Sequence, residues 1–192
     1  MAALVREIKP LLHPVQKMVY GIRHGQAWHN VLYSHFGNEA YSNHRDTTLT
    51  GYGMQQAVQA RPPCVDIVFV SPSLRTLQTA SLMYPKTPKV AMECLKEYPQ
   101  EVEICNQRSS TYFLQQCFPE VDFSDLVTEE QDWPNVKITP AQNKERAQAI
   151  ISMRPETRIA LVTHSTWLKY YMHDTMTSEP ELEHCVAYPL KL

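Results

Sequence analysis

The sequence predicts an α/β fold, a three-layer sandwich in which a mostly parallel central sheet carries helices on both faces. Three short apolar runs support this prediction, and each is followed directly by polar residues: 18–22, 65–70 and 158–163. Runs of this length and composition are typical of strands that are buried on both faces. Helical patterns lie between the runs, and strands that alternate with helices favour a parallel sheet.

Each of three predicted helices follows a residue that favours a helix N-terminus: 51–60 after Thr50, 74–83 after Ser73, and 141–153 after Thr139-Pro140. A hydroxyl just before a helix can accept a hydrogen bond from a free backbone N–H, and proline is tolerated in the first turn. Two shorter apolar runs, 89–92 and 185–190, are compatible with additional strands.

A single domain is expected to span residues 1–192, because 43% hydrophobic residues in a chain of this length can bury one substantial core. The prolines follow helical patterns closely, so they terminate helices rather than mark linkers. The region of about 98–138 lacks clean periodicity and is interpreted as an irregular insert. It is predicted to contain a helix around Thr111–Cys117 followed by loop, and it is a candidate cover for the site.

Composition excludes several classes of partner and cofactor. The formal net charge is -2 and no run of Lys and Arg occurs, so neither nucleic acid nor an anionic membrane is expected to bind. No apolar stretch approaches the roughly 18 residues needed to span a bilayer. Charged residues at positions 6–9 stand where a signal peptide would need its apolar segment. We therefore expect a cytoplasmic protein. The five cysteines lack disulfide spacing and the eight histidines lack metal-ligand spacing, so we expect reduced thiols and no metal.

The residues with chemical potential follow the predicted strands. They are Arg23, His24, Arg75 and His164. In a parallel sheet, side chains beyond the carboxyl ends of the strands converge on one crevice. Guanidinium groups match the oxygens of a phosphate dianion, and one imidazole can attack phosphorus while the other stabilises charge. The set therefore predicts phosphoryl transfer.

Four ordered segments resemble those of the histidine phosphatase superfamily, in its phosphoglycerate mutase-like branch (branch 1). Residues 23–26 resemble R-H-G-E, 46–57 resemble D-x-x-L-T-x-x-G-x-x-Q-A, 71–80 resemble S-P-x-x-R-x-x-Q-T-A, and 161–165 resemble the late strand that ends in histidine. The resemblance runs from about Val19 to Trp167. It implies the phosphoglycerate mutase-like form of the sandwich.

The resemblance implies that His24 is the nucleophile and that no cofactor is needed. Arg23 and Arg75 would clamp the phosphoryl oxygens, and His164, held in its protonated form by the bound dianion, would add a third positive charge. Asn30 matches the family's downstream asparagine and would donate to the same phosphate. A helix expected to begin near Gln26 would point its free N–H groups toward the anion.

Two departures from the family pattern concern acidic residues. Gln26 replaces the usual glutamate, which removes one negative charge beside the phosphate site. Residues 95–97 resemble the family's L-x-E and make Glu97 the candidate proton donor, but the residues after it do not follow the pattern. Three neighbouring carboxylates remain alternatives: Glu93, Glu101 and Glu103.

The function predicted from these residues is hydrolysis of a small phosphomonoester through a phosphohistidine on His24. One alternative is phosphoglycerate mutase-type transfer, and another is a catalytically weak member that serves as a binding protein. Residues 23–30 read R-H-G-Q-A-W-H-N, whereas the mutases carry R-H-G-E-S-x-W-N and longer inserts, which favours water as the acceptor. The physiological substrate and the oligomeric state stay open.

Overall fold

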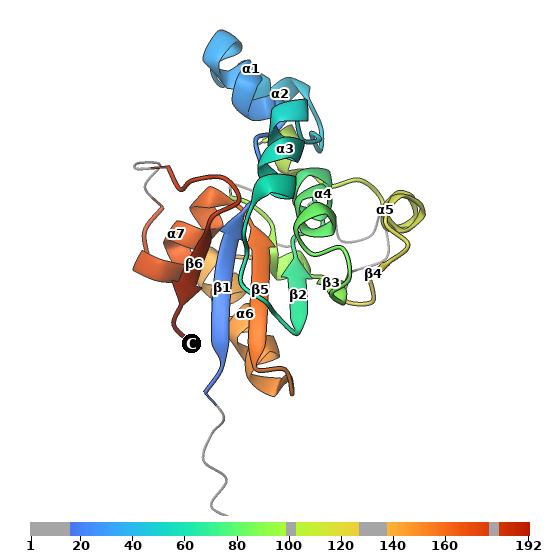
Figure 1. Ribbon diagram of the computed structural model, residues 1–192. Helices are drawn as coiled ribbons and strands as arrows, with labels where there is room; N and C mark the ends of the chain where they lie inside the picture. The colour runs from blue at the N-terminus through green and yellow to red at the C-terminus, as the bar shows by residue number, and fades with distance from the viewer. Residues whose placement is uncertain (1–15, 99–102, 127–137, 177–180) are drawn as a thin grey trace, which may run out of the picture.

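A six-stranded sheet lies at the centre of the computed structural model, which describes residues 16–98, 103–126, 138–176 and 181–192 (Figure 1). The strand order is β4-β3-β2-β5-β1-β6. Only β6 runs antiparallel to its neighbour, and the other neighbours pair in parallel. The strands are β1 (Met18–Arg23), β2 (Ile67–Val70), β3 (Lys89–Ala91), β4 (Val121–Asp122), β5 (Arg158–Thr163) and β6 (Ala187–Leu190).

Helices connect these strands within the described ranges. They are α1 (Trp28–Phe36), α2 (Glu39–Asn43), α3 (Gly51–Gln59), α4 (Leu74–Met83), α5 (Thr111–Cys117), α6 (Pro140–Met153) and α7 (Ser165–His173), with 3-10 turns η1 (Glu93–Leu95) and η2 (Ile104–Asn106). Two of the predicted start signals act as expected, because the hydroxyls of Thr50 and Thr139 accept from backbone N–H groups in the first turns of α3 and α6. Ser73 makes no such bond. Asp46 replaces it, since its carboxylate accepts from the N–H of Leu74 at 2.8 Å.

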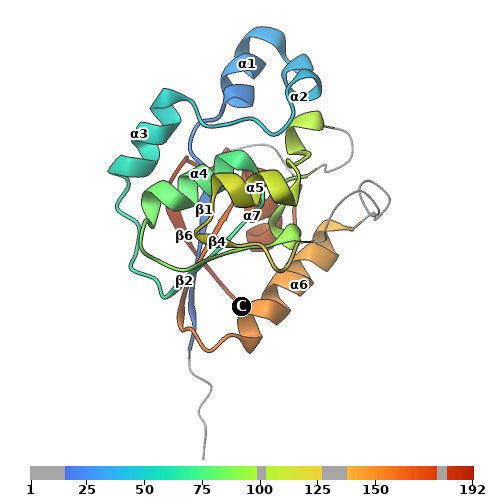
Figure 2. The same cartoon turned by 90° about the vertical axis from the view of Figure 1, so that its right-hand side faces the viewer.

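Apolar side chains alternate between the two faces of the sheet, and each face carries its own core. Val68 and Val70 of β2 pack in a cluster that includes Leu77 of α4 and residues of α3 and α5. Phe69 packs on the other face, in a cluster that includes Ile151 of α6 and residues of α7. Figure 2 shows the sheet viewed nearly edge-on, with α3 on one side and α6 on the other. The predicted three-layer α/β sandwich is therefore confirmed.

The upper end of the sheet in Figure 1 is where the carboxyl ends of β1, β2 and β5 meet. Helices α1 and α2 lie beyond this end, above β1. The chain enters α1 directly after β1 and returns through α3 toward β2. Residues that follow these strands are thus gathered beneath α1 and α2.

Several local features differ from the prediction. The helix expected near Gln26 begins at Trp28, after an extended Ala27. The predicted helix at Thr111–Cys117 is present as α5, but the residues after it form β4 rather than loop, because Val121 pairs with Lys89 at the sheet edge. Parts of the insert, 99–102 and 127–137, lie outside the described residues. Within the described residues, no helix combines the length and the apolar character needed to cross a membrane.

Candidate active site

His24 lies at the carboxyl end of β1 and is 3% exposed. Its Nδ1 is 2.7 Å from the carbonyl oxygen of Gly25. Because a carbonyl only accepts, Nδ1 must carry the proton, and Nε2 keeps its lone pair. Burial, followed by the positive charges of Arg75 and neighbouring groups, holds the pKa of His24 well below its usual value. The imidazole is therefore neutral near pH 7 and has a free nucleophilic nitrogen.

Arg75 projects from the first turn of α4 and is completely buried. Its terminal nitrogens donate to the carbonyl oxygen of Cys105 and to Oδ1 of Asn106, both at 2.9 Å. These acceptors belong to η2, so this part of the insert reaches the site and orients the guanidinium. No described residue accepts a hydrogen bond from Nε of Arg75.

Arg23, the last residue of β1, is hydrogen-bonded to residues far along the chain, just before β6. Its Nη1 donates to Oε2 of Glu181 at 2.9 Å and to the carbonyl oxygen of Leu182 at 2.6 Å. The side chain of Arg23 is 5% exposed, whereas that of Glu181 is 61% exposed. The Nε of Arg23 is also buried without an acceptor among the described residues.

His164 follows β5, as predicted, and is the residue just before α7. Its ring centroid is 5.3 Å from that of His24. Nε2 lies 2.8 Å from Oγ of Ser71, and Nδ1 is buried with no partner in the described part of the chain. Burial and the charge of Arg75 hold the pKa of His164 well below its usual value, which favours the neutral ring near pH 7.

Three buried nitrogens around His24 thus share one property. Nε of Arg23, Nε of Arg75 and Nδ1 of His164 make no hydrogen bond within the described residues. A buried polar group without a partner costs about 1–3 kcal/mol, so such groups are rare, and a bound water, ion or ligand is one way to satisfy them. Two guanidinium groups and an imidazole are suited to a phosphate dianion.

The side chains of Asn30 and Gln26 both form hydrogen bonds that stabilise the segment after His24. Oδ1 of Asn30 accepts from the N–H of Ala27 at 3.0 Å and thereby caps the start of α1. Its amide group remains the donor that a phosphate contact would need. Oε1 of Gln26 accepts from the hydroxyl of Thr50 at 2.9 Å, so the glutamine ties the loop after His24 to the start of α3.

Glu97 lies at the N-terminus of α7, the helix that directly follows His164. Its carboxylate accepts from the backbone N–H groups of Tyr98, Thr166 and Trp167, at 2.9, 3.1 and 3.0 Å. Burial raises the pKa of Glu97, although these N–H donors and the charge of Arg75 oppose the rise. A carboxyl group with a raised pKa is better suited to donate a proton near neutral pH.

The alternative carboxylates differ in their surroundings. Glu93 forms ion pairs with Lys96 at 2.7 Å and Arg108 at 2.6 Å. Burial opposes ionisation there, but the two cations hold the pKa of Glu93 below its usual value, which disfavours a proton donor. Burial raises the pKa of Glu103, which accepts from Asn106 at 2.9 Å, so this residue stays an alternative to Glu97. Glu101 lies outside the described residues.

Two further histidines contact this site, and sequence reasoning did not select them. The ring centroids of His29 and His184 each lie 5.7 Å from that of His24. His184 places Nδ1 2.6 Å from the carbonyl oxygen of His24. His29 lies in the first turn of the helix that follows His24, so its position in the sequence could have identified it as a site residue. Nothing in the sequence relates His184 to the site, because the two are 160 residues apart.

The loop that carries His24 packs directly on α3 through two glycines. A Cβ added to Gly25 would lie 2.6 Å from the carbonyl oxygen of Gly53, and one added to Gly53 would overlap the backbone of Gln26. The N–H of Gly25 donates to Oγ1 of Thr79 on α4 at 3.0 Å. The backbone beside His24 is therefore held by contacts with both α3 and α4.

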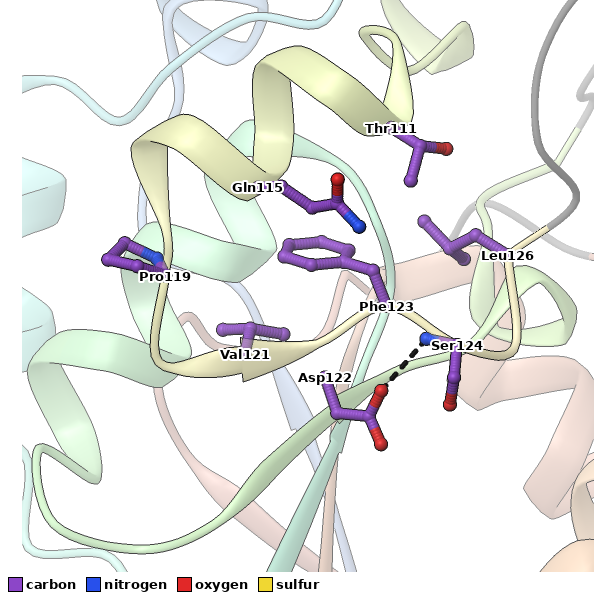
Figure 3. A pocket seen from close by; sticks show the side chains of 8 residues that line it. All are labelled: Thr111, Gln115, Pro119, Val121, Asp122, Phe123, Ser124 and Leu126. Atoms are coloured by element: carbon purple, nitrogen blue, oxygen red, sulfur yellow. Dashed lines mark hydrogen bonds between the residues drawn. The ribbon is translucent and has the colours of Figure 1, made fainter.

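A cavity of about 450 Å³ lies elsewhere, between α5 and the segment that forms β4 (Figure 3). Thr111, Gln115, Phe123 and Leu126 contribute to its lining, and neither histidine nor arginine is among its lining residues. It lies at the β4 edge of the sheet rather than at the strand ends near His24. The candidate chemistry is thus separate from this cavity.

The fold and the site together define an α/β protein with two histidines and two arginines gathered at the carboxyl end of a parallel sheet. The chain belongs to the histidine phosphatase superfamily (branch 1), whose family model matches residues 19–188.

A curated relative, "Phosphoglycerate mutase-like protein 1" from Arabidopsis thaliana, is 30% identical over 82% of this chain and 72% of the relative. Among solved structures, the alpha-ribazole phosphatase from Shigella flexneri has a TM-score of 0.53 at 21% identity, covering 88% of each chain. The ecdysone phosphate phosphatase from Bombix mori has a TM-score of 0.56 at 17% identity, covering 90% of this chain and 88% of that one. The two structures support the fold alone, and the curated relative is named as mutase-like.

Proposed function

We propose that this chain is a cofactor-independent phosphomonoester hydrolase that works through a phosphohistidine on His24. The observation that carries the proposal is the set of side chains gathered around His24. A buried, neutral imidazole with a fixed tautomer is surrounded by three cationic or proton-accepting side chains, each with a buried nitrogen that lacks a partner among the described residues. These residues fit a phosphate group better than any neutral ligand.

In the first step, Nε2 of His24 attacks phosphorus. A P–N bond forms while the P–O bond to the leaving group breaks, and the electron pair stays on the leaving oxygen. Glu97 gives its proton to that oxygen, and its raised pKa is consistent with this role. Arg23 and Arg75 stabilise the charge on the equatorial oxygens, and His164 joins them once the dianion has raised its pKa.

In the second step, water replaces the leaving group. Glu97, now ionised, takes a proton from the water as its oxygen attacks phosphorus. The P–N bond breaks, the electron pair returns to Nε2 of His24, and inorganic phosphate leaves. Asn30 is proposed to donate its amide N–H to the phosphoryl group in both steps. The proposed substrate is a small phosphorylated molecule.

The test is to trap the intermediate with a ³²P-labelled phosphomonoester. We expect an acid-labile, alkali-stable adduct that is absent from His24→Ala and present in His173→Ala, a control that changes an exposed histidine at the end of α7. Label on serine, threonine or aspartate would overturn the mechanism.

A chase of the labelled protein separates hydrolysis from the mutase alternative, which the name of the Arabidopsis thaliana relative favours. Release of the label as inorganic phosphate, unaffected by added phosphoglycerate, supports hydrolysis. Transfer of most of the label to phosphoglycerate would support mutase chemistry instead.

A further inference from the structure

His29 is buried beside the nucleophile and has no part in the mechanism above. It lies in the first turn of α1, is 6% exposed, and its ring stands at 60° to that of His24 with centroids 5.7 Å apart. His164 stands in nearly the same relation to His24, at 67° and 5.3 Å. The two rings therefore lie at comparable distances from the ring of His24 and at comparable angles to it.

The hydrogen bonds of the two rings match as well. His164 has one nitrogen held by the hydroxyl of Ser71, and His29 has Nδ1 held 2.6 Å from the hydroxyl of Thr47, which is itself buried. Nδ1 of His164 is buried without a partner in the described part of the chain, and the described hydrogen-bond partner of His29 is Thr47, through Nδ1. A hydroxyl can rotate either to donate or to accept, so each ring can present an N–H at its second nitrogen.

The charges around His29 favour an anion at that nitrogen. Burial first, and then the positive charges of Arg75 and Arg23, lower the pKa of His29. The same two arginines act on His24 and His164, so all three rings face one concentration of positive charge. A histidine that served only to connect α1 to Thr47 would not have to lie within this concentration of positive charge.

We propose that His29 is a further substrate-contacting residue, whose Nε2 donates a hydrogen bond to the phosphoryl group. This inference rests on the proposed function, because it assumes that a phosphoryl group occupies the space beside His24. It adds a third imidazole to the two that the mechanism uses. The substrate group recognised is the phosphoryl group itself and not the alcohol attached to it.

Two isosteric substitutions separate this role from a structural one. The side-chain amide of glutamine reaches about as far as Nε2 of histidine, whereas that of asparagine reaches about as far as Nδ1. His29→Gln should therefore keep a donor at the phosphoryl group, and His29→Asn should keep only the bond to Thr47. If His29 acts only through its hydrogen bond to Thr47, the opposite result is expected: His29→Asn should bind phosphate better than His29→Gln.

The measurement is binding of inorganic phosphate by calorimetry, with thermal melting to confirm that each variant folds. We expect His29→Asn and His29→Phe to weaken phosphate binding roughly 10- to 100-fold, which is the range for losing a hydrogen bond to a charged group. His29→Gln should stay within about threefold of the unmodified protein on the same scale. His35→Phe is the matched control, since it changes an exposed histidine on the same helix and should bind phosphate normally.

Retained binding in all three His29 variants, or loss in His29→Gln with retention in His29→Asn, would overturn the inference. Should His29→Phe fail to fold, the comparison of glutamine with asparagine still decides. If the unmodified protein neither binds phosphate nor becomes phosphorylated on His24, the proposed function fails as well. A failure of the His29 inference alone leaves that phosphorylation intact.

Discussion

Replacing Glu97 with glutamine tests the proton donor and perturbs the structure in a way that can be worked out in advance. The carboxylate accepts three backbone N–H groups through its two oxygens. A glutamine keeps one oxygen and places an NH₂ group where the other oxygen was, so at least one N–H at the start of α7 faces a donor. The substitution therefore has a structural effect as well as a chemical one.

The two effects have separate magnitudes. Leaving one or two polar groups unsatisfied costs about 1–3 kcal/mol, and for a chain of this size each kcal/mol lowers the melting temperature by about 2–4 °C. Loss of a general acid slows the chemical step by roughly 10²- to 10⁴-fold when the leaving group is an alkoxide. An aryl oxide such as p-nitrophenolate leaves without much help, so its departure should slow far less.

The assay compares single-turnover formation of phosphohistidine from an alkyl phosphate and from p-nitrophenyl phosphate, well below the melting temperature of the variant. Single turnover is needed because Glu97 is also the proposed base of the second step, whose loss would slow every substrate alike. Glu103→Gln is the matched control, since Glu103 is the described alternative whose pKa burial also raises.

Unequal losses for Glu97→Gln, with little change for Glu103→Gln, are the expected result. Equal small losses with both esters would refute the assignment of Glu97, and the unequal pattern in Glu103→Gln would move the role to that residue. Equal large losses would mean that Glu97 matters by capping α7 and not as an acid.

Two more outcomes follow from the charges at the site. Chelation with EDTA should leave turnover unchanged, because Arg23, Arg75 and a protonated His164 supply the positive charge that a divalent metal supplies elsewhere; activity lost in EDTA and restored by a metal would contradict this. The pKa of His164 is lowered in the folded protein, so below about pH 6.5 the folded protein binds fewer protons than the unfolded chain. The contribution of His164 to stability is therefore complete above that pH and is lost as the pH falls. The melting temperature should therefore fall less between pH 7.5 and 5.5 in His164→Gln than in the unmodified protein, and an equal fall in both would disprove the shift.

The central sheet was predictable from the sequence because its strands are buried on both faces. All four residues of β2 are buried, and so are five of the six residues of β5, which leaves continuous apolar runs that no amphipathic helix would show. The short strand β4 was missed because Val121 and Asp122 pair only at the sheet edge, where two residues leave no periodic pattern.

The candidate site was predictable where local motifs carry it and not where tertiary contacts complete it. His24 and His164 follow strands, so their meeting follows from the parallel sheet. The acceptors that orient Arg75 come from η2, and the partner of Arg23 is Glu181; both are set by how distant segments pack. Glu97 was selected by resemblance, but its function as a cap for α7 depends on a contact 70 residues away.

The two facing glycines near His24 limit which substitutions this protein can accept. At most positions a damaging substitution can be compensated by a smaller neighbour, but here the obstacle on each side is main chain: the carbonyl of Gly53 faces Gly25, and the backbone of Gln26 faces Gly53. No second substitution can make a backbone smaller. Selection for new substrates can therefore explore the side chains of α1, α2 and the insert, while the contact of these two glycines stays closed to change, and libraries that randomise either position should yield almost no active clones.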